Sequence, residues 1–145
     1  SADTAIREKL ALPLSLKDLQ QKYTMLRENG IKIISFVNVG LPGENWNNAL
    51  NNYNFCASTS DFTKWVDYKP LPGAAWFESL AKKIQQKIIA KQYSYQIYAP
   101  TRHVSRLSAG QFQKITAMYD DLEINNLKNI GCQEHKKGSV VERVL

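Results

Sequence analysis

A nearly continuous apolar run, IKIISFVNV at residues 31–39, constrains the fold of this chain more than any other stretch. The run is rich in β-branched and aromatic residues, a pattern that is typical of a strand buried on both faces. It ends at GLPGENW, where Gly40, Pro42 and Gly43 break the chain and are expected to shape a turn. We therefore expect residues 31–39 to form a central strand of a sheet.

Helices are predicted ahead of this strand. Ser15 and Asp18 have the spacing of a capping box, and Gly30 stands where a helix usually ends. With apolar residues at helical spacing between them, residues 16–29 are predicted to form a helix. Residues 4–12 are predicted to form a shorter one.

Two helices and a strand are predicted in the second half of the chain. AWFESLAKKIQQKIIAKQ (75–92) has one apolar side at helical spacing, and YSYQIYA (93–99) alternates as a strand does. Ser108 and Gln111 form a second capping-box pattern. The apolar face of the helix that follows consists of Phe112, Ile115, Tyr119 and Leu122.

Two segments have weaker patterns. NWNNALNNYN holds six Asn in ten residues, and Asn favours turns and caps, so only a short helix at 46–50 and an edge strand at 62–68 are indicated. Near the C-terminal end, NIGCQ and SVVERVL flank EHKKG, which is typical of a hairpin. The stretch 40–75 is longer than most loops, so it either hides structure or carries function.

These elements predict the fold class α+β. With 145 residues, 43% of them hydrophobic, the chain is long enough for a single globular domain (1–145) around one core. We expect a mixed sheet of about four strands with three or four helices packed on it.

The net charge is +6, from 19 Lys and Arg against 13 Asp and Glu. This balance favours anionic partners such as nucleic acid, an acidic protein or a lipid surface, although no block of like charges forms a basic arm. No apolar run approaches the roughly 18 residues that span a bilayer, and we expect no transmembrane segment. The aromatic and apolar content excludes a disordered chain.

Cys56 and Cys132 are a candidate disulfide, which would close a loop of about 77 residues and stabilise the fold by roughly 4 kcal/mol. Two buried thiols are the alternative. A bridge would favour a periplasmic or secreted protein, and free thiols a cytoplasmic one. With His103 and His135 as the only histidines, zinc ligands at the usual spacing are lacking, and we expect no metal and no cofactor.

The connection before the last predicted helix contains TRHVSR (101–106). Such connections at strand ends bind ligands in many folds. His103 as general acid or base, with Arg102 holding a phosphate, would suit a small basic, metal-independent ribonuclease or toxin-like domain, in which His135 is the candidate second imidazole. The alternative is a solvated junction, and no catalytic residue is assigned.

Aromatic residues between 40 and 69 indicate a contact surface, because Trp and Tyr dominate binding hot spots. The alternative is that these rings pack the segment onto the body of the domain. The leading hypothesis is a non-catalytic interaction or accessory domain that binds a protein or other anionic partner through residues 40–69 and the 100–106 connection. Its predicted binding residues are Trp46, Tyr53, Trp65, Arg102 and Arg106.

A third hypothesis is a non-catalytic nucleic-acid-binding domain. Lysines and aromatic rings interleave at Lys64, Trp65 and Tyr68, which would provide stacking platforms and phosphate contacts. The sequence leaves the partner and the oligomeric state open.

Overall fold

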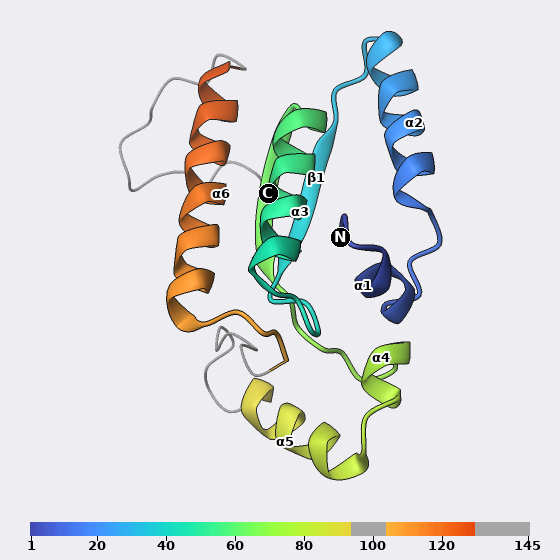
Figure 1. Cartoon of the computed structure of the whole chain (residues 1–145), viewed down its shortest axis with the longest axis vertical. Coiled ribbons are helices and arrows are strands. Elements are labelled where there is room, and N and C mark those ends of the chain that lie inside the picture. Colours follow the sequence, from blue (N-terminus) through green and yellow to red (C-terminus); the bar gives the residue numbers. More distant parts are fainter. Residues whose placement is uncertain (94–103, 130–145) are drawn as a thin grey trace.

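A computed structural model describes residues 1–93 and 104–129 of the chain (Figure 1). Within these ranges, six helices and two strands follow one another, and a helix separates the two strands. The bounds are α1 Thr4–Lys9, α2 Leu16–Glu28, β1 Ile34–Val39, α3 Trp46–Thr59, β2 Phe62–Asp67, α4 Ala75–Glu78, α5 Lys82–Tyr93 and α6 Ala109–Asn129.

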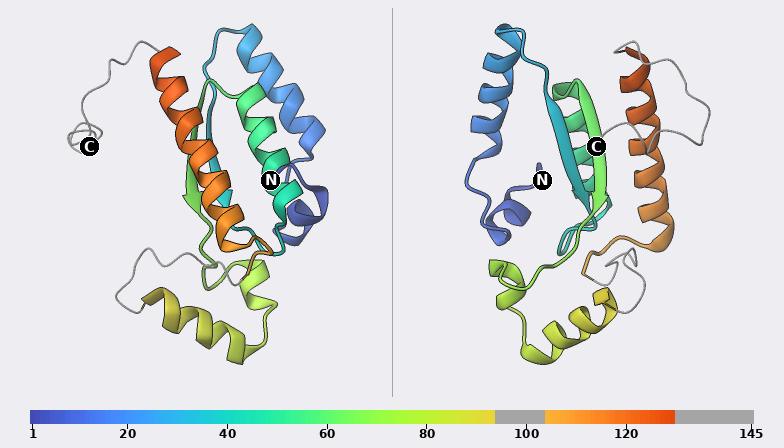
Figure 2. Two further views of the ribbon diagram at one scale, coloured as in Figure 1. Left: turned by 60° about the vertical axis from the view of Figure 1, so that its left-hand side comes forward. Right: turned by 180° about the vertical axis from the view of Figure 1, so that it is seen from behind.

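β1 and β2 form a two-stranded parallel sheet, in which Ile34 pairs with Phe62 and Val39 with Asp67. A parallel pair needs a long crossover connection, and α3 supplies it. The views in Figures 1 and 2 agree that α3 lies over one face of the pair. This strand–helix–strand unit forms the middle of the molecule.

The prediction of a mixed sheet of about four strands with three or four helices is wrong. The described residues form six helices and a sheet of two strands. The stretch 40–75 contains a 14-residue crossover helix, which lengthens the short helix predicted there and makes β1 and β2 parallel neighbours. Of the strand predicted at 93–99, Tyr93 ends α5 and the rest lies outside the described residues, as does the predicted hairpin within 130–145.

β1 is buried on one face only, which corrects the expectation of a strand buried on both. Ser35, Val37 and Val39 are buried, whereas the side chains of Ile34 and Phe36 are 60% and 75% exposed. α3 and α6 cover the buried side of the sheet. No helix of the described residues covers the other side, as the right-hand view of Figure 2 shows.

α3 is much longer than the short helix predicted at 46–50. Asn45 and Asn48 form a reciprocal capping box at its start, with both hydrogen bonds at 3.0 Å. The helix then continues because Ala49 and Cys56 are buried in the core. These two residues are about two turns apart and lie on the same face of the helix. Tertiary packing thus outweighs the weak helix propensity of the Asn-rich segment.

α6 has the apolar face that its sequence predicts. Phe112, Ile115 and Tyr119 are buried in one core cluster with residues of β1 and α3. The predicted capping box is also confirmed, because the Gln111 N–H donates to the Ser108 hydroxyl at 3.2 Å and the Ser108 N–H donates to the Gln111 side chain at 2.9 Å.

The other helices confirm one prediction and correct another. α2 ends one residue short of the predicted 16–29, and the capping box at Ser15 is formed. The helix predicted over 75–92 is instead divided into α4 and α5. The Ser79 hydroxyl donates to the Trp76 carbonyl at 2.6 Å at the break, and such side-chain bonds compete with helical pairing.

The loop between β1 and α3 is built around the carboxylate of Glu44, which is 1% exposed. One of its oxygens accepts hydrogen bonds from the N–H groups of Gly40 (2.8 Å) and Leu41 (3.2 Å), and the other accepts one from the Asn52 amide (2.9 Å). Gly40 has a φ of +86°, and a Cβ added there would lie 3.3 Å from the ring of Phe112. Both the turn and the close approach of α6 therefore require glycine at this position.

The same loop binds the segment that leads into α6. The Gly43 N–H donates to the Val104 carbonyl at 2.9 Å, and the Arg106 N–H donates to the Glu44 carbonyl at 2.8 Å. Residues far apart in the sequence are thereby joined through their backbones.

Thr63 offers a test of the packing between β2 and α6. It is 1% exposed, and its hydroxyl has no hydrogen-bond partner within the described ranges. Valine has nearly the same shape and removes the unsatisfied group, so we expect Thr63→Val to raise the free energy of unfolding by about 1 kcal/mol in urea titrations. Thr116→Val is the control, because that hydroxyl donates to the Phe112 carbonyl at 3.0 Å; equal stabilisation by both changes would contradict the expectation.

Glu44 gives the fold a pH dependence. Burial is the main cause that raises its pKa above the ordinary 4.5, opposed by the hydrogen bonds from Gly40, Leu41 and Asn52. A carboxyl group with a raised pKa in the folded state binds more protons there than in the unfolded chain, so its contribution to stability falls as pH rises above 4.5. We expect the unfolding free energy of the wild type, minus that of Glu44→Gln, to fall between pH 4.5 and 7.

The difference between the two proteins isolates Glu44 from other carboxylates. Asp61 has a lowered pKa, mainly because its carboxylate accepts a hydrogen bond from the Ile33 N–H. The contribution of Asp61 to the unfolding free energy therefore decreases as pH falls, which is the opposite direction to that of Glu44. A difference that stays constant or rises with pH would show that Glu44 is not destabilised by its burial.

Candidate functional site

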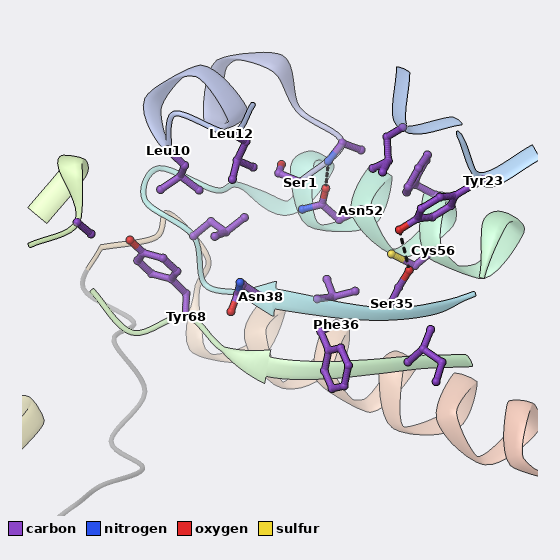
Figure 3. A pocket seen from close by; sticks show the side chains of 17 residues that line it. Ser1, Leu10, Leu12, Tyr23, Ser35, Phe36, Asn38, Asn52, Cys56 and Tyr68 are labelled. Atoms are coloured by element: carbon purple, nitrogen blue, oxygen red, sulfur yellow. Dashed lines mark hydrogen bonds between the residues drawn. The ribbon is translucent and has the colours of Figure 1, made fainter. Parts of the chain in front are cut away.

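A groove of about 470 Å³ lies beside the free edge of β1 (Figure 3). The residues that face β1 across it come from the segment before α1, from the turn between α1 and α2, and from α2, and residues of α3 also contribute. The 17 residues that line it are Ser1, Ala2, Leu10, Leu12, Leu19, Tyr23, Ile34, Ser35, Phe36, Val37, Asn38, Leu41, Asn52, Phe55, Cys56, Tyr68 and Ala74.

β1 contributes its backbone edge to the groove. The carbonyls of Ile33 and Val39 accept hydrogen bonds from the β2 side, at 3.1 Å from the Phe62 N–H and 2.8 Å from the Tyr68 N–H. Because backbone groups of a strand point alternately to its two sides, those of residues 34, 36 and 38 point away from β2. β1 has one neighbouring strand in the described part of the chain, so these groups form an open edge.

The groove is uncharged in its side chains. Its lining contains no Asp, Glu, Lys, Arg or His, and it is largely apolar. Phe36 projects from β1 on the side opposite Ser35 (Figure 3), and Leu12 is 40% exposed on the opposite wall. The arrangement therefore favours an apolar, uncharged occupant over an anionic one.

α2 is held beside the sheet by a few contacts. The hydroxyls of Tyr23 and Ser35 lie 3.4 Å apart, and Ser35 is 2.6 Å from the hydroxyl of Ser60. The ring of Tyr23 also lies 6.1 Å from that of Phe55 in α3. Since no residue of α2 is buried, these contacts set the width of the groove without filling it.

Two polar groups that line the groove, the Cys56 thiol and the Asn52 amide, are protonated or already hydrogen-bonded. Cys56 is 7% exposed, and burial raises the pKa of its thiol to about 11, so it stays protonated near neutral pH and is a poor nucleophile. Asn52 is occupied, because its amide donates to Glu44 and its oxygen accepts a hydrogen bond from the Ala2 N–H. Residues 1–93 and 104–129 contain no cluster of His, Cys, Asp and Glu suited to a metal ion.

The aromatic residues predicted to bind lie against the core instead of in the groove. Trp46, Tyr53 and Trp65 are partly buried and pack on the core cluster. Lys114 lies 5.4 Å from the centre of the Trp46 ring, and the Trp65 indole N–H donates to Asp120 at 2.7 Å. The structure thus gives these three rings contacts within the domain.

The predicted 100–106 connection is described only from residue 104 onward. Arg106 lies beside the β1–α3 loop, where its N–H bonds to Glu44. Arg102, His103 and Cys132 lie outside the described residues, and so does His135. The predicted disulfide and the predicted imidazole chemistry therefore stay predictions.

Sequence reasoning missed the groove. Ile34 and Phe36 fall in the strand that is expected to be buried on both faces, and Leu19 and Tyr23 are among the apolar residues at helical spacing in the helix predicted at 16–29. The available signal was the polar content of α2, whose few apolar side chains are too sparse to bury a whole face.

Comparisons of the chain with protein-family models, with curated proteins and with solved structures found no match. No helix in the part of the chain that the structure describes has the length and apolar character needed to cross a membrane. The geometry of the groove is therefore the basis for a functional proposal.

The burial of Cys56 can be tested by alkylation. In a Cys132→Ser variant, Cys56 is the only cysteine, and its pKa of about 11 lies two units above the ordinary 9.0. The thiolate fraction near neutral pH is then about 100-fold lower than for an ordinary thiol, and poor access slows the reaction further. We expect iodoacetamide to modify the folded protein about 100-fold more slowly than the urea-unfolded protein, or more slowly still. The reaction is followed by measuring the intact mass of the protein over time.

Similar rates in the two states would show that Cys56 is accessible. The wild-type protein, alkylated in denaturant without reductant, tests the predicted bridge in the same experiment. Modification of both cysteines would rule out a disulfide between Cys56 and Cys132.

Proposed function

We propose that this chain is a non-catalytic interaction domain that binds an extended segment of a partner protein. The segment adds to the free edge of β1 as a further strand and lies in the groove between β1 and the N-terminal helices. This mode of recognition takes its affinity from backbone hydrogen bonds and its specificity from side-chain contacts on either side of the strand.

One observation carries the proposal. Five consecutive residues of β1, Ile34 to Asn38, line a groove along an open backbone edge. Consecutive strand residues alternate between the two faces of a sheet, so a groove that touches all five follows the edge itself. An extended peptide is the ligand whose shape and hydrogen-bonding groups fit such an edge.

The lining supports a particular partner chemistry. Because the groove has no charged side chain, the bound segment is expected to be uncharged and mostly apolar. The net charge of +6 suggests an anionic partner, but no positively charged side chain lines this groove to bind one. The groove does include Leu41, Asn52, Phe55, Cys56 and Tyr68 of the 40–69 segment that the sequence indicates as a binding surface.

The ribonuclease hypothesis depends on His103 and Arg102, which lie outside the described residues. The nucleic-acid hypothesis used Lys64 and Trp65, whose side chains bond to Glu123 and Asp120 of α6 at 2.6 and 2.7 Å. Neither hypothesis has support from the groove, so the interaction domain is preferred.

Phe36 provides the test, because its side chain is 75% exposed and its N–H lies on the open edge. Peptides of ten residues would be selected from a random phage library on the wild-type protein and measured by fluorescence anisotropy. Phe36→Ala removes the ring but keeps the N–H, whereas Phe36→Pro also removes the donor and places a ring on the edge. We expect Phe36→Pro to bind at least about tenfold more weakly than Phe36→Ala.

Equal affinities for the two variants, or failure to select any peptide, would contradict the proposal. Backbone methylation of the selected peptide gives a second readout. Methyl groups on alternate nitrogens should abolish binding in one register and be tolerated in the other, because a strand pairs through every second residue.

A further inference from the structure

α5 has the highest net positive charge of the described helices. Its sequence, KKIQQKIIAKQY, contains four lysines and no acidic residue. The helix lies at one end of the molecule, next to α4 and away from the sheet (Figures 1 and 2). The side chains of Lys82, Lys83 and Lys87 are exposed.

The orientation of α5 turns these lysines outward. The Gln85 amide donates to the carbonyls of Phe77 at 3.2 Å and Leu80 at 2.9 Å, and Ile88 is 2% exposed, so these two residues mark the inner face. Lys83 and Lys87 each stand two residues from Gln85, which places them about 200° around the helix axis from it. They therefore lie on the opposite, outer face.

The charges of these lysines are not neutralised within the described ranges. Lys32 and Lys64 form ion pairs with Asp61 and Glu123, at 3.4 and 2.6 Å. Lys82, Lys83 and Lys87 have no such pair in the described part of the chain. The outer face of α5 consequently presents a positive potential to the solvent.

Exposed apolar side chains flank the lysines. Ile84 and Ile89 are 48% and 37% exposed. At about 100° per residue, Ile84 lies about 60° from Lys87, at one border of the lysine face, whereas Ile89 lies about 40° from Gln85, beside the inner face. Leu71, ahead of α4, is a further exposed apolar residue, at 59%. A helix that combines lysines with exposed apolar residues has the chemistry of a membrane interface.

We propose that the outer face of α5 binds the surface of an anionic phospholipid bilayer. The lysines would contact the headgroups, with their methylene chains extended towards the interface, and Ile84 would enter the boundary with the acyl chains. A nucleic acid would use the same cations but leave Ile84 in water. This site is separate from the groove and does not depend on it.

Vesicle sedimentation tests the proposal with the full chain. We expect the protein to bind phosphatidylcholine vesicles that contain phosphatidylserine and to bind pure phosphatidylcholine weakly. Replacing Lys83 and Lys87 with Gln should weaken partitioning by about 30-fold, since each lysine near an anionic surface contributes about fivefold. Lys17→Gln with Lys22→Gln is the matched control, because it changes the net charge equally on exposed positions of α2.

Ile84→Ser distinguishes a lipid surface from any other polyanion, because it leaves the charge unchanged. We expect it to weaken vesicle binding severalfold and to leave the circular dichroism spectrum unaltered. An equal loss of vesicle binding in the Lys83/Lys87 and Lys17/Lys22 double variants would overturn the assignment to α5. Binding of a labelled RNA duplex that is tighter than vesicle binding and insensitive to Ile84→Ser would overturn the lipid proposal in favour of nucleic acid.

Discussion

The buried carboxylate of Glu44 holds together the parts on which the rest of the fold depends. It accepts hydrogen bonds from the end of β1 and from α3, and its own backbone pairs with Arg106, which leads into α6. In strand–helix units, the end of a parallel strand and the start of the next helix are where anionic ligands commonly bind. Here the chain's own carboxylate occupies that position.

The two proposed surfaces lie on different parts of the fold: the groove results from how unevenly the sheet is covered, and the basic face belongs to α5, away from the sheet. α3 and α6 bury one face, whereas α2 stands beside β1 through a few contacts and leaves the edge open. The groove has no charged side chain and α5 is strongly basic, so the two surfaces suit ligands of different chemistry. A protein with both would hold a partner segment close to an anionic membrane.

The starts of two helices could be predicted from short sequence patterns. The capping boxes at Ser15 and Ser108 involve residues three apart, so both helix starts were predicted correctly. α3 was predicted too short because its stability comes from the burial of residues such as Cys56. The Asn-rich sequence favours turns, so local propensity gives no sign of this burial. The exposure of Phe36 was not predictable, because an apolar run does not reveal how many layers cover a strand. Trp46 shows the same limit, since its exposure depends on where α6 packs.

Gly40 links the shape of one loop to the spacing of two layers. Its φ of +86° sets the turn after β1, and the space where a Cβ would stand is bordered by the ring of Phe112 at 3.3 Å. A side chain at this position would need the ring of Phe112 to move by a few tenths of an ångström, and the loop would hold it in a conformation that L residues rarely adopt. A single residue therefore couples the path of this loop to the position of the first turn of α6.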